Sequence, residues 1–213
     1  MKIVSQSVEY LNHMGSDLSI VNAARVSFAK AHDTLQPTDT GLINYLAKHN
    51  HWSPFAHTSI SLRVKCPIFV ARQLGKHQVG LVWNEVSRRY VDEEPEFFWP
   101  KEWRGRPENA KQGSSGVVDW QIDPWSTTVA LGSYLSAINH GVAPEQARMV
   151  LPQNTMTEFI WTGSLMAFVR VCQLRLDSHT QLETQEIAEK ISSILQPLYP
   201  LSYKALMGET TND

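Results

Sequence analysis

The clearest pattern in the chain is a strict alternation of apolar and polar side chains over residues 57–66. Ile60, Leu62, Val64 and Cys66 fall on one face, and serine, arginine and lysine side chains fall on the other. Successive side chains of a β-strand point to opposite faces, so this segment predicts a strand that is buried on one side. Residues 155–162 predict a second strand.

A helical pattern is typical of seven segments, which are residues 17–33, 38–50, 67–77, 124–141, 143–151, 164–176 and 180–198. Asp17 is a candidate N-cap of the first helix, and Thr38 or Thr40 of the second, because short polar side chains accept hydrogen bonds from first-turn N–H groups. Gly141 and Pro152 are expected to end the fourth and fifth helices.

The stretch from about Asp92 to Pro124 shows no period and contains four prolines and three tryptophans. Irregular segments of this length are often functional. Elsewhere, helices and strands mix without a regular βαβ alternation, which favours an α+β fold over a doubly wound sheet. The length of 213 residues does not require two domains, so we expect a single domain over residues 1–213.

Composition narrows the class of protein. With 42% hydrophobic and 19% charged residues, the chain resembles an ordinary globular protein, and its net charge of -2 disfavours a dedicated duplex binder. Cys66 and Cys172 lie in apolar runs, as expected of free thiols in a reducing compartment. Because no apolar leader or 18-residue apolar run is present, we expect a cytoplasmic protein without a membrane partner.

The sequence lacks the motifs of several common nucleotide, metal and hydrolase sites. The sequence has no glycine-rich dinucleotide fingerprint, P-loop or nucleophile elbow. His49, His51 and His57 lie close together, but their spacing matches no standard zinc motif, so no metal site is expected. Ser87 and His77 could form a hydrolase pair, but no orienting acid stands at a recognisable spacing.

Arginines within apolar segments are more informative. Arg72, Arg148 and Arg175 each lie in or beside an apolar helix pattern, whereas Arg170 falls on the face opposite the apolar stripe of residues 165–172. A guanidinium drawn toward a core must be paired or must bind an anion. Each arginine could form a structural ion pair with Glu85, Glu145 or Asp177, or it could bind an anionic ligand. The set of arginines as a whole favours a ligand.

Four segments resemble the family of flavin-dependent thymidylate synthases. The family signature is Arg-His-Arg followed by seven or eight residues and a serine, and the equivalent here is Lys76-His77-Gln78, eight residues and Ser87. Residues 51–57 (HWSPFAH), 145–152 (EQARMVLP) and 174–181 (LRLDSHTQ) are similar to three further segments of the family. Order and spacing agree from about residue 17 to residue 195.

The resemblance implies an α+β fold with a mainly antiparallel sheet, and a homotetramer whose active sites are shared between subunits. It also implies FAD as cofactor and reductive methylation of dUMP to dTMP. Methylenetetrahydrofolate would supply the carbon and NADPH would reduce the flavin. The protein partners would then be these small molecules and further copies of the chain, with no nucleic acid.

The family's functional residues transfer to matching positions of this sequence. The expected dUMP ligands are Gln73, Lys76, Glu85, Ser87, Arg88, Arg89, Arg148 and Arg175. The residues expected to face FAD are Ser53, Lys76, His77, Gln78, Glu85, Ser164, Leu165, Met166 and Arg170. The expected catalytic residues are Arg175, which would favour the ionised uracil, and His51, near the flavin and folate.

Two departures from the family qualify this expectation. Lys76 and Gln78 replace both arginines of the signature, and Arg170 stands where the family often has a neutral amide. One hypothesis is that Arg170 restores the positive charge lost at Gln78. The alternatives are a nucleotide-phosphate binding protein that lost the flavin chemistry, and a single-strand nucleic-acid binder that uses the basic signature and the tryptophans.

Overall fold

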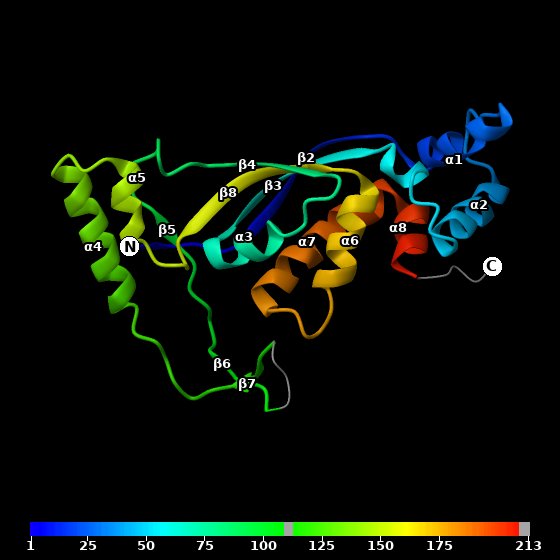
Figure 1. The fold of residues 1–213 in the computed structure, drawn as a ribbon. Coiled ribbons are helices and arrows are strands. Elements are labelled where there is room, and N and C mark those ends of the chain that lie inside the picture. Colours follow the sequence, from blue (N-terminus) through cyan, green and yellow to red (C-terminus); the bar gives the residue numbers. More distant parts are fainter. Residues whose placement is uncertain (109–112, 209–213) are drawn as a thin grey trace.

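The fold is built on a four-stranded antiparallel sheet with the strand order β2-β3-β8-β4 (Figure 1). The computed structural model describes residues 1–108 and 113–208. The strands are β2 (Ser7–Met14), β3 (Ser59–Pro67), β8 (Met156–Gly163) and β4 (Leu81–Glu85). In β3, Ile60, Leu62, Val64 and Cys66 are fully buried, as the alternation predicts.

Three helices cover the buried face of this sheet, and Figure 1 shows them beneath it. They are α3 (Ile68–Leu74), α6 (Leu165–Arg175) and α7 (Leu182–Leu198). The core between the two layers includes Trp161 of β8 and Phe168 of α6, whose rings meet edge to face with centroids 5.3 Å apart. The described residues place no helix over the opposite face, where Val82 and Ile160 are exposed.

Helices also close the two ends of the sheet. At one end lie α1 (Asp17–Arg25), α2 (Pro37–Lys48) and α8 (Pro200–Met207). At the other end lie α4 (Trp125–Asn139) and α5 (Pro144–Ala147) (Figure 1). No described helix is long and apolar enough to span a membrane.

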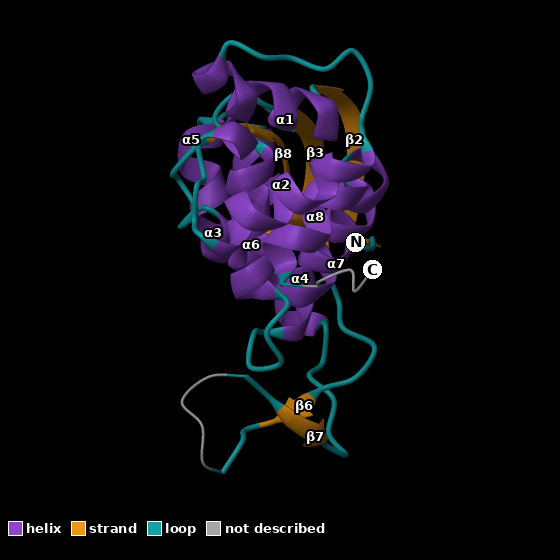
Figure 2. Cartoon of the chain, turned by 90° about the vertical axis from the view of Figure 1, so that its right-hand side faces the viewer, coloured by secondary structure: helices purple, strands orange, loops and turns teal. Residues whose placement is uncertain are grey.

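The segment from residue 92 to 124 contains three very short strands. β5 (Glu96–Phe97) pairs in parallel with β1 (Lys2–Ile3), and β6 (Arg104–Gly105) pairs with β7 (Ser115–Val117). Figure 2 shows the β6–β7 pair projecting from the body of the molecule. Residues 109–112 of this segment lie outside the described residues.

Both predicted strands and all seven predicted helical segments are present, and several boundaries differ. Asp17 is the first residue of α1 and follows the N-cap Ser16, so the N-cap assigned to it was wrong. Its carboxylate is turned to α8, where it accepts hydrogen bonds from the N–H groups of Leu201 and Ser202 at 2.9 and 3.0 Å. The α1 helix ends at Arg25, well before residue 33.

The remaining corrections concern helix starts and missed elements. Gln36, rather than Thr38 or Thr40, is the N-cap of α2, because its N–H binds the Asp39 carboxylate at 2.9 Å. The helix predicted over residues 143–151 stops at Ala147 and continues as a 3-10 turn. Strands β2 and β4 and helix α8 were not predicted.

Candidate active site

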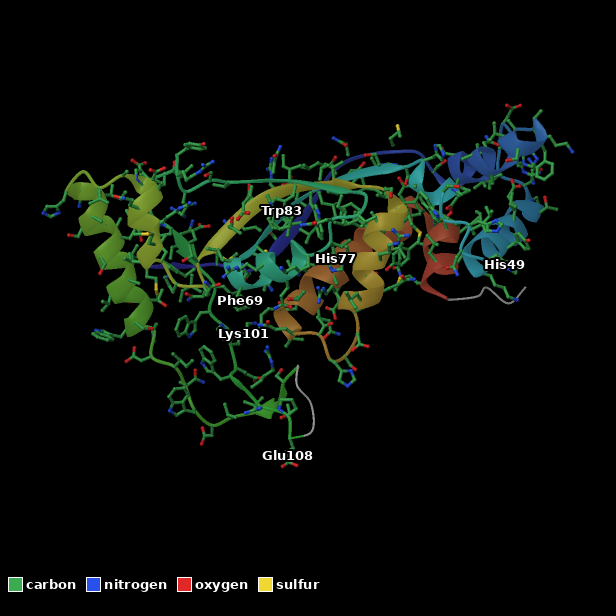
Figure 3. The ribbon with its side chains drawn as sticks, viewed as in Figure 1. His49, Phe69, His77, Trp83, Lys101 and Glu108 are labelled. Carbon is green, nitrogen blue, oxygen red and sulfur yellow. The ribbon has the colours of Figure 1, made fainter. Side chains whose placement is uncertain are left out.

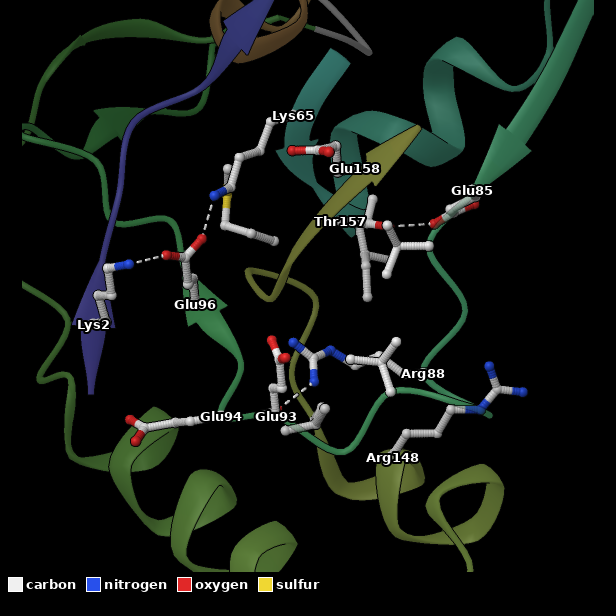
Figure 4. A pocket seen from close by; sticks show the side chains of 15 residues that line it. Lys2, Lys65, Glu85, Arg88, Glu93, Glu94, Glu96, Arg148, Thr157 and Glu158 are labelled. Atoms are coloured by element: carbon white, nitrogen blue, oxygen red, sulfur yellow. Dashed lines mark hydrogen bonds and ion pairs between the residues drawn. The ribbon is translucent and has the colours of Figure 1, made fainter. Parts of the chain in front are cut away.

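An open cavity of about 590 Å³ lies between the start of β8, the segment after β4 and the turn after α5 (Figure 4). Arg88 and Arg148 project into it from different elements. Arg88 Nη1 donates to the carbonyl of Glu93 at 2.9 Å, and Arg148 Nε donates to the carbonyl of Glu145 at 3.3 Å. Among the described residues, neither guanidinium forms an ion pair with a carboxylate.

Glu85 stands in the wall of this cavity at the end of β4, opposite the two arginines (Figure 4). Its Oε1 accepts a hydrogen bond from Thr157 Oγ1 at 2.5 Å, and its Oε2 accepts one from Trp83 Nε1 at 3.2 Å. Glu85 also lines a smaller cavity of about 390 Å³ with Trp83 and His77. The Glu85 carboxylate therefore borders both cavities.

Ser87 and Arg89 form a local unit on the loop after β4. The Ser87 hydroxyl accepts hydrogen bonds from the N–H and from Nε of Arg89, both at 3.3 Å. The Arg89 guanidinium also lies 5.0 Å from the centroid of the Tyr90 ring, a cation–π distance. Arg89 is exposed, so this guanidinium remains accessible to an anion.

His77 and Arg175 contact each other across 98 residues of sequence. Arg175 Nε donates to His77 Nε2 at 3.0 Å, and Arg175 Nη2 donates to the Gln73 carbonyl at 3.3 Å. Burial, together with the nearby charge of Arg175, lowers the pKa of His77 below its ordinary 6.5. The imidazole is therefore neutral at pH 7 and serves as an acceptor that orients the guanidinium.

The side chain of Gln73, an expected dUMP ligand, is engaged within the chain. Its Nε2 donates to Gln181 Oε1 at 2.5 Å, and its Oε1 accepts from Thr184 Oγ1 at 3.2 Å. Gln181 in turn donates to Glu183, which also receives Arg104 Nη2 at 2.7 Å. This chain of contacts ties the irregular segment to the end of α3.

The residues expected to face FAD surround the first turn of α6. Gly80 has a φ of +74°, and a Cβ on Gly163 would lie 2.6 Å from the Gly80 carbonyl oxygen. The turn over residues 76–80 is therefore pressed against the start of α6, where Ser164 Oγ caps the N–H of Ala167 at 3.2 Å. A helix N-terminus carries partial positive charge that favours phosphate.

The exposed side chains around this turn are hydrogen-bond donors or cations. Lys76 and Gln78 are exposed on the turn, and Arg170 is exposed on α6 one helical turn after Met166, which is half-buried. Such a donor set fits the pyrophosphate of FAD. Leu165 is fully buried and its N–H is bound by Thr58 Oγ1 at 2.8 Å, so its side chain does not face this surface.

His51 and Ser53 lie in the segment after α2, directly before the 3-10 turn Pro54–Ala56 that packs against α6. The ring of Tyr45 meets those of His49 and His51 at centroid distances of 4.4 and 5.8 Å. Figure 3 shows His49 at the α2 end and His77 near the middle of the molecule. Within one chain, the structure does not bring the two expected catalytic residues, His51 and Arg175, together.

Some interpretations of the sequence do not hold. Arg72 is exposed at the end of α3 and is not drawn toward the core. Ion pairs from Arg148 or Arg175 to Glu85, Glu145 or Asp177 are absent among the described residues, so the structural reading of these arginines is not supported. Within the same residues, no group of three histidine, cysteine, aspartate or glutamate side chains could hold a metal ion.

Sequence reasoning also missed residues that shape the site. The missed residues are Trp83, Thr157, Gln181, Glu183 and Arg104, whose partners lie up to 108 residues away or on a neighbouring strand. The only available signal was indirect. A tryptophan two residues before a glutamate in a strand places both side chains on one face.

The chain is similar to known proteins in sequence and in fold. Residues 9–201 match the family model described as "Thymidylate synthase complementing protein". A flavin-dependent thymidylate synthase from Thermus thermophilus is 38% identical over 205 residues, covering 93% of this chain and 74% of the relative.

A solved structure extends the similarity to the fold. A UMP/dUMP methylase, PolB from Streptomyces cacaoi, bound with 5-Br dUMP, has a TM-score of 0.86 at 30% identity and covers 98% of this chain and 97% of its own. A second structure of that protein, bound with 5-Br UMP, has a TM-score of 0.84 at 28% identity. The chain therefore belongs to the family of flavin-dependent thymidylate synthases.

Proposed function

We propose that the protein is an FAD-dependent methyltransferase that converts dUMP to dTMP, with methylenetetrahydrofolate as carbon donor and NADPH as reductant. The observation that carries this proposal is the cavity in which Arg88 and Arg148, without carboxylate partners, face Glu85. A dianionic phosphate suits the two guanidinium groups, and the hydrogen-bond donors of a nucleoside suit a carboxylate.

We assign the chemistry at the base to Arg175. An ionised uracil is the better nucleophile at C5, and a fixed guanidinium stabilises that anion. The neutral His77 supports this role because its Nε2 accepts a hydrogen bond from Arg175 Nε–H and so orients the guanidinium. No protein nucleophile is needed, since the flavin supplies the hydride when bound.

The surface formed by residues 76–80 and the start of α6 is the proposed FAD site. Lys76, Gln78 and Arg170 would hold the phosphates, and Ser164 and His77 would border the flavin. If Arg170 compensates for the glutamine of the signature, Arg170→Gln should raise the dissociation constant of FAD about tenfold, as measured by flavin fluorescence. An unchanged constant would refute the compensation.

We further propose a homotetramer with active sites shared between subunits. It is supported by the partners of the two expected catalytic residues: among the described residues, His51, which follows α2, contacts Tyr45, whereas Arg175, the last residue of α6, contacts His77 and Gln73. The uncovered face of the sheet also exposes Met14, Val82 and Ile160, which a second chain could bury. Two free buried cysteines support a place in the reducing cytoplasm, and the single core supports one domain.

One experiment tests the main proposal. The purified protein is loaded with FAD, and NADPH oxidation is followed with and without dUMP, after which methylenetetrahydrofolate is added and dTMP is measured. The proposal expects dUMP-dependent oxidation and dTMP formation. A protein that binds dUMP but never FAD would instead support the non-catalytic nucleotide binder.

A parallel arm uses UMP in place of dUMP, because the structural neighbour PolB is a UMP/dUMP methylase. Faster turnover of UMP would revise the substrate while keeping the reaction class. Arg106→Ala is a suitable control variant, since this exposed arginine lines none of the cavities described above.

A further inference from the structure

We propose that Trp83 and Thr157 are positioning residues for substrate binding. They fix the Glu85 carboxylate in one orientation, so that its unused lone pairs accept hydrogen bonds from the nucleotide. The inference rests on the proposed function and adds two residues: Trp83, one of the eight unspecified positions within the signature, and Thr157, which lies outside all four family segments.

Both oxygens of Glu85 are held, each by a different strand. Trp83 lies two residues before Glu85 on β4, so the two side chains share one face of the sheet, and the indole Nε1 donates to Oε2 at 3.2 Å. Thr157 on β8 donates to Oε1 at 2.5 Å (Figure 4). An ionised carboxylate has about four acceptor positions, so about two remain for a ligand.

The two donors are themselves immobilised. The Trp83 ring stacks on Phe159 with centroids 3.3 Å apart and an angle of 15°, and it meets Trp161 edge to face at 5.7 Å. Thr157 is held within β8, where it pairs with Cys66 of β3. The indole and the hydroxyl therefore cannot follow Glu85 if it rotates.

Glu85 needs such support because nothing else holds it. Its side chain is exposed, and among the described residues no lysine, arginine or histidine forms an ion pair with it. A free glutamate samples several rotamers, and ordering it on binding would weaken affinity. With the carboxylate fixed opposite Arg88 and Arg148, the cavity presents an acceptor at one side and an anion site at the other (Figure 4).

The test measures binding of dUMP to the FAD-loaded protein by titration calorimetry. Trp83→Phe keeps an aromatic ring beside Phe159 but removes the N–H together with part of the indole, and Thr157→Val keeps the shape and replaces the hydroxyl by a methyl group. Each is expected to raise the dissociation constant of dUMP about tenfold. Thr157→Ser, which restores a hydroxyl, should recover most of the affinity.

A double-mutant cycle separates positioning from a general structural role. In a Glu85→Ala background, Trp83→Phe should cause no further loss, because the indole acts through the carboxylate. An equal loss with and without Glu85, or no loss at all, overturns the inference. Melting temperatures are measured alongside, and Thr157→Val gives an independent answer if Trp83→Phe lowers stability.

Trp120→Phe and Thr38→Val are matched controls, since both residues are exposed and lie outside the cavities. Their dUMP affinities should equal that of the unaltered protein. If the unaltered protein binds dUMP and the Trp83 and Thr157 variants bind it equally well, only this inference fails. If the unaltered protein binds no dUMP, the proposed function fails with it.

Discussion

Individual arginines of this protein have two distinct uses, which their partners separate. Arg25 and Arg104 pair with the buried carboxylates of Asp39 and Glu183, at 2.8 and 2.7 Å. Within residues 1–108 and 113–208, the hydrogen bonds of the Arg88 and Arg148 guanidinium groups go to backbone carbonyls, and both side chains line a cavity. The first pair holds the fold together, and the second pair is free to bind an anion.

Arg148→Ala is predicted to weaken dUMP binding by about 10- to 100-fold, the loss expected of one charge-assisted contact to phosphate. Titration calorimetry measures the effect. Deoxyuridine, which lacks the phosphate, should bind the variant and the unaltered protein equally weakly. A similar loss for both ligands would place Arg148 away from the phosphate.

The contact between His77 and Arg175 predicts a pH dependence of stability. The pKa of His77 is lowered in the folded protein, so the unfolded chain binds more protons between that pKa and 6.5. The stabilisation is present above pH 6.5 and is lost as the pH falls below it. Urea unfolding at pH 7.5 and 5.5 should show a larger decrease for the unaltered protein than for His77→Gln.

Individual residues show what the sequence could predict: it indicated which residues belong to the site, but not which contacts their side chains make. The resemblance named His77 and Arg175, but their contact spans 98 positions and has no local pattern. Gln73 was named as a ligand, yet its amide binds Gln181 and Thr184. Residue types follow from a motif, whereas the direction of a side chain depends on packing between distant elements.

At the scale of elements, burial decided which segments could be predicted. The alternation in β3 is visible because one face is fully buried, with Leu62 and Val64 among its residues. The edge strands β2 and β4 expose side chains on both faces, so apolar and polar residues do not alternate cleanly along them. Helix α8 was missed because its start is set by a distant carboxylate, Asp17.

The link between α1 and α2 depends on Asp39. This carboxylate is fully buried and accepts hydrogen bonds from the Gln36 N–H, Arg25 and His32. Burial alone would raise the pKa of Asp39, but these three donors outweigh it and lower the pKa to about 2. The charged form therefore stabilises the fold above pH 3.8 and is lost below it.

Asp39→Asn is predicted to lower the free energy of unfolding by roughly 3 kcal/mol, because it leaves Arg25 without its charge partner in a partly buried site. Urea unfolding at pH 7 measures the change. Asp123→Asn, on an exposed turn before α4, should alter the free energy by less than about 0.5 kcal/mol. Equal effects of the two substitutions would contradict the role given to Asp39.

For the molecule as a whole, one chain carries two separated parts of the proposed active site. Glu85 ends β4, Arg148 follows α5 and Arg175 ends α6, whereas His51 follows α2. The sequence could indicate both parts, since motifs carry them. It could not place them, because their separation follows from the length of the sheet between them.

Shared active sites predict complementation between inactive variants. His51→Ala and Arg175→Ala are each expected to lose most activity when assembled alone. Mixed oligomers, formed by co-expression with two different tags, should regain up to about a quarter of the activity through sites whose two parts come from unaltered segments. Mixed oligomers as inactive as their parents would place the whole site within one chain.

The contact between the Asp17 carboxylate and α8 affects the order in which the chain can fold while it is being synthesised. It is buried, and its partners are the N–H groups at the start of α8, 184 and 185 residues later. While the chain emerges from the ribosome, α1 and α2 are made early, but the helix that they pack against follows only after more than 150 further residues, with Leu201 made 184 residues after Asp17. This end of the molecule should therefore be the last to close, and it is where a nascent chain most needs protection by a chaperone.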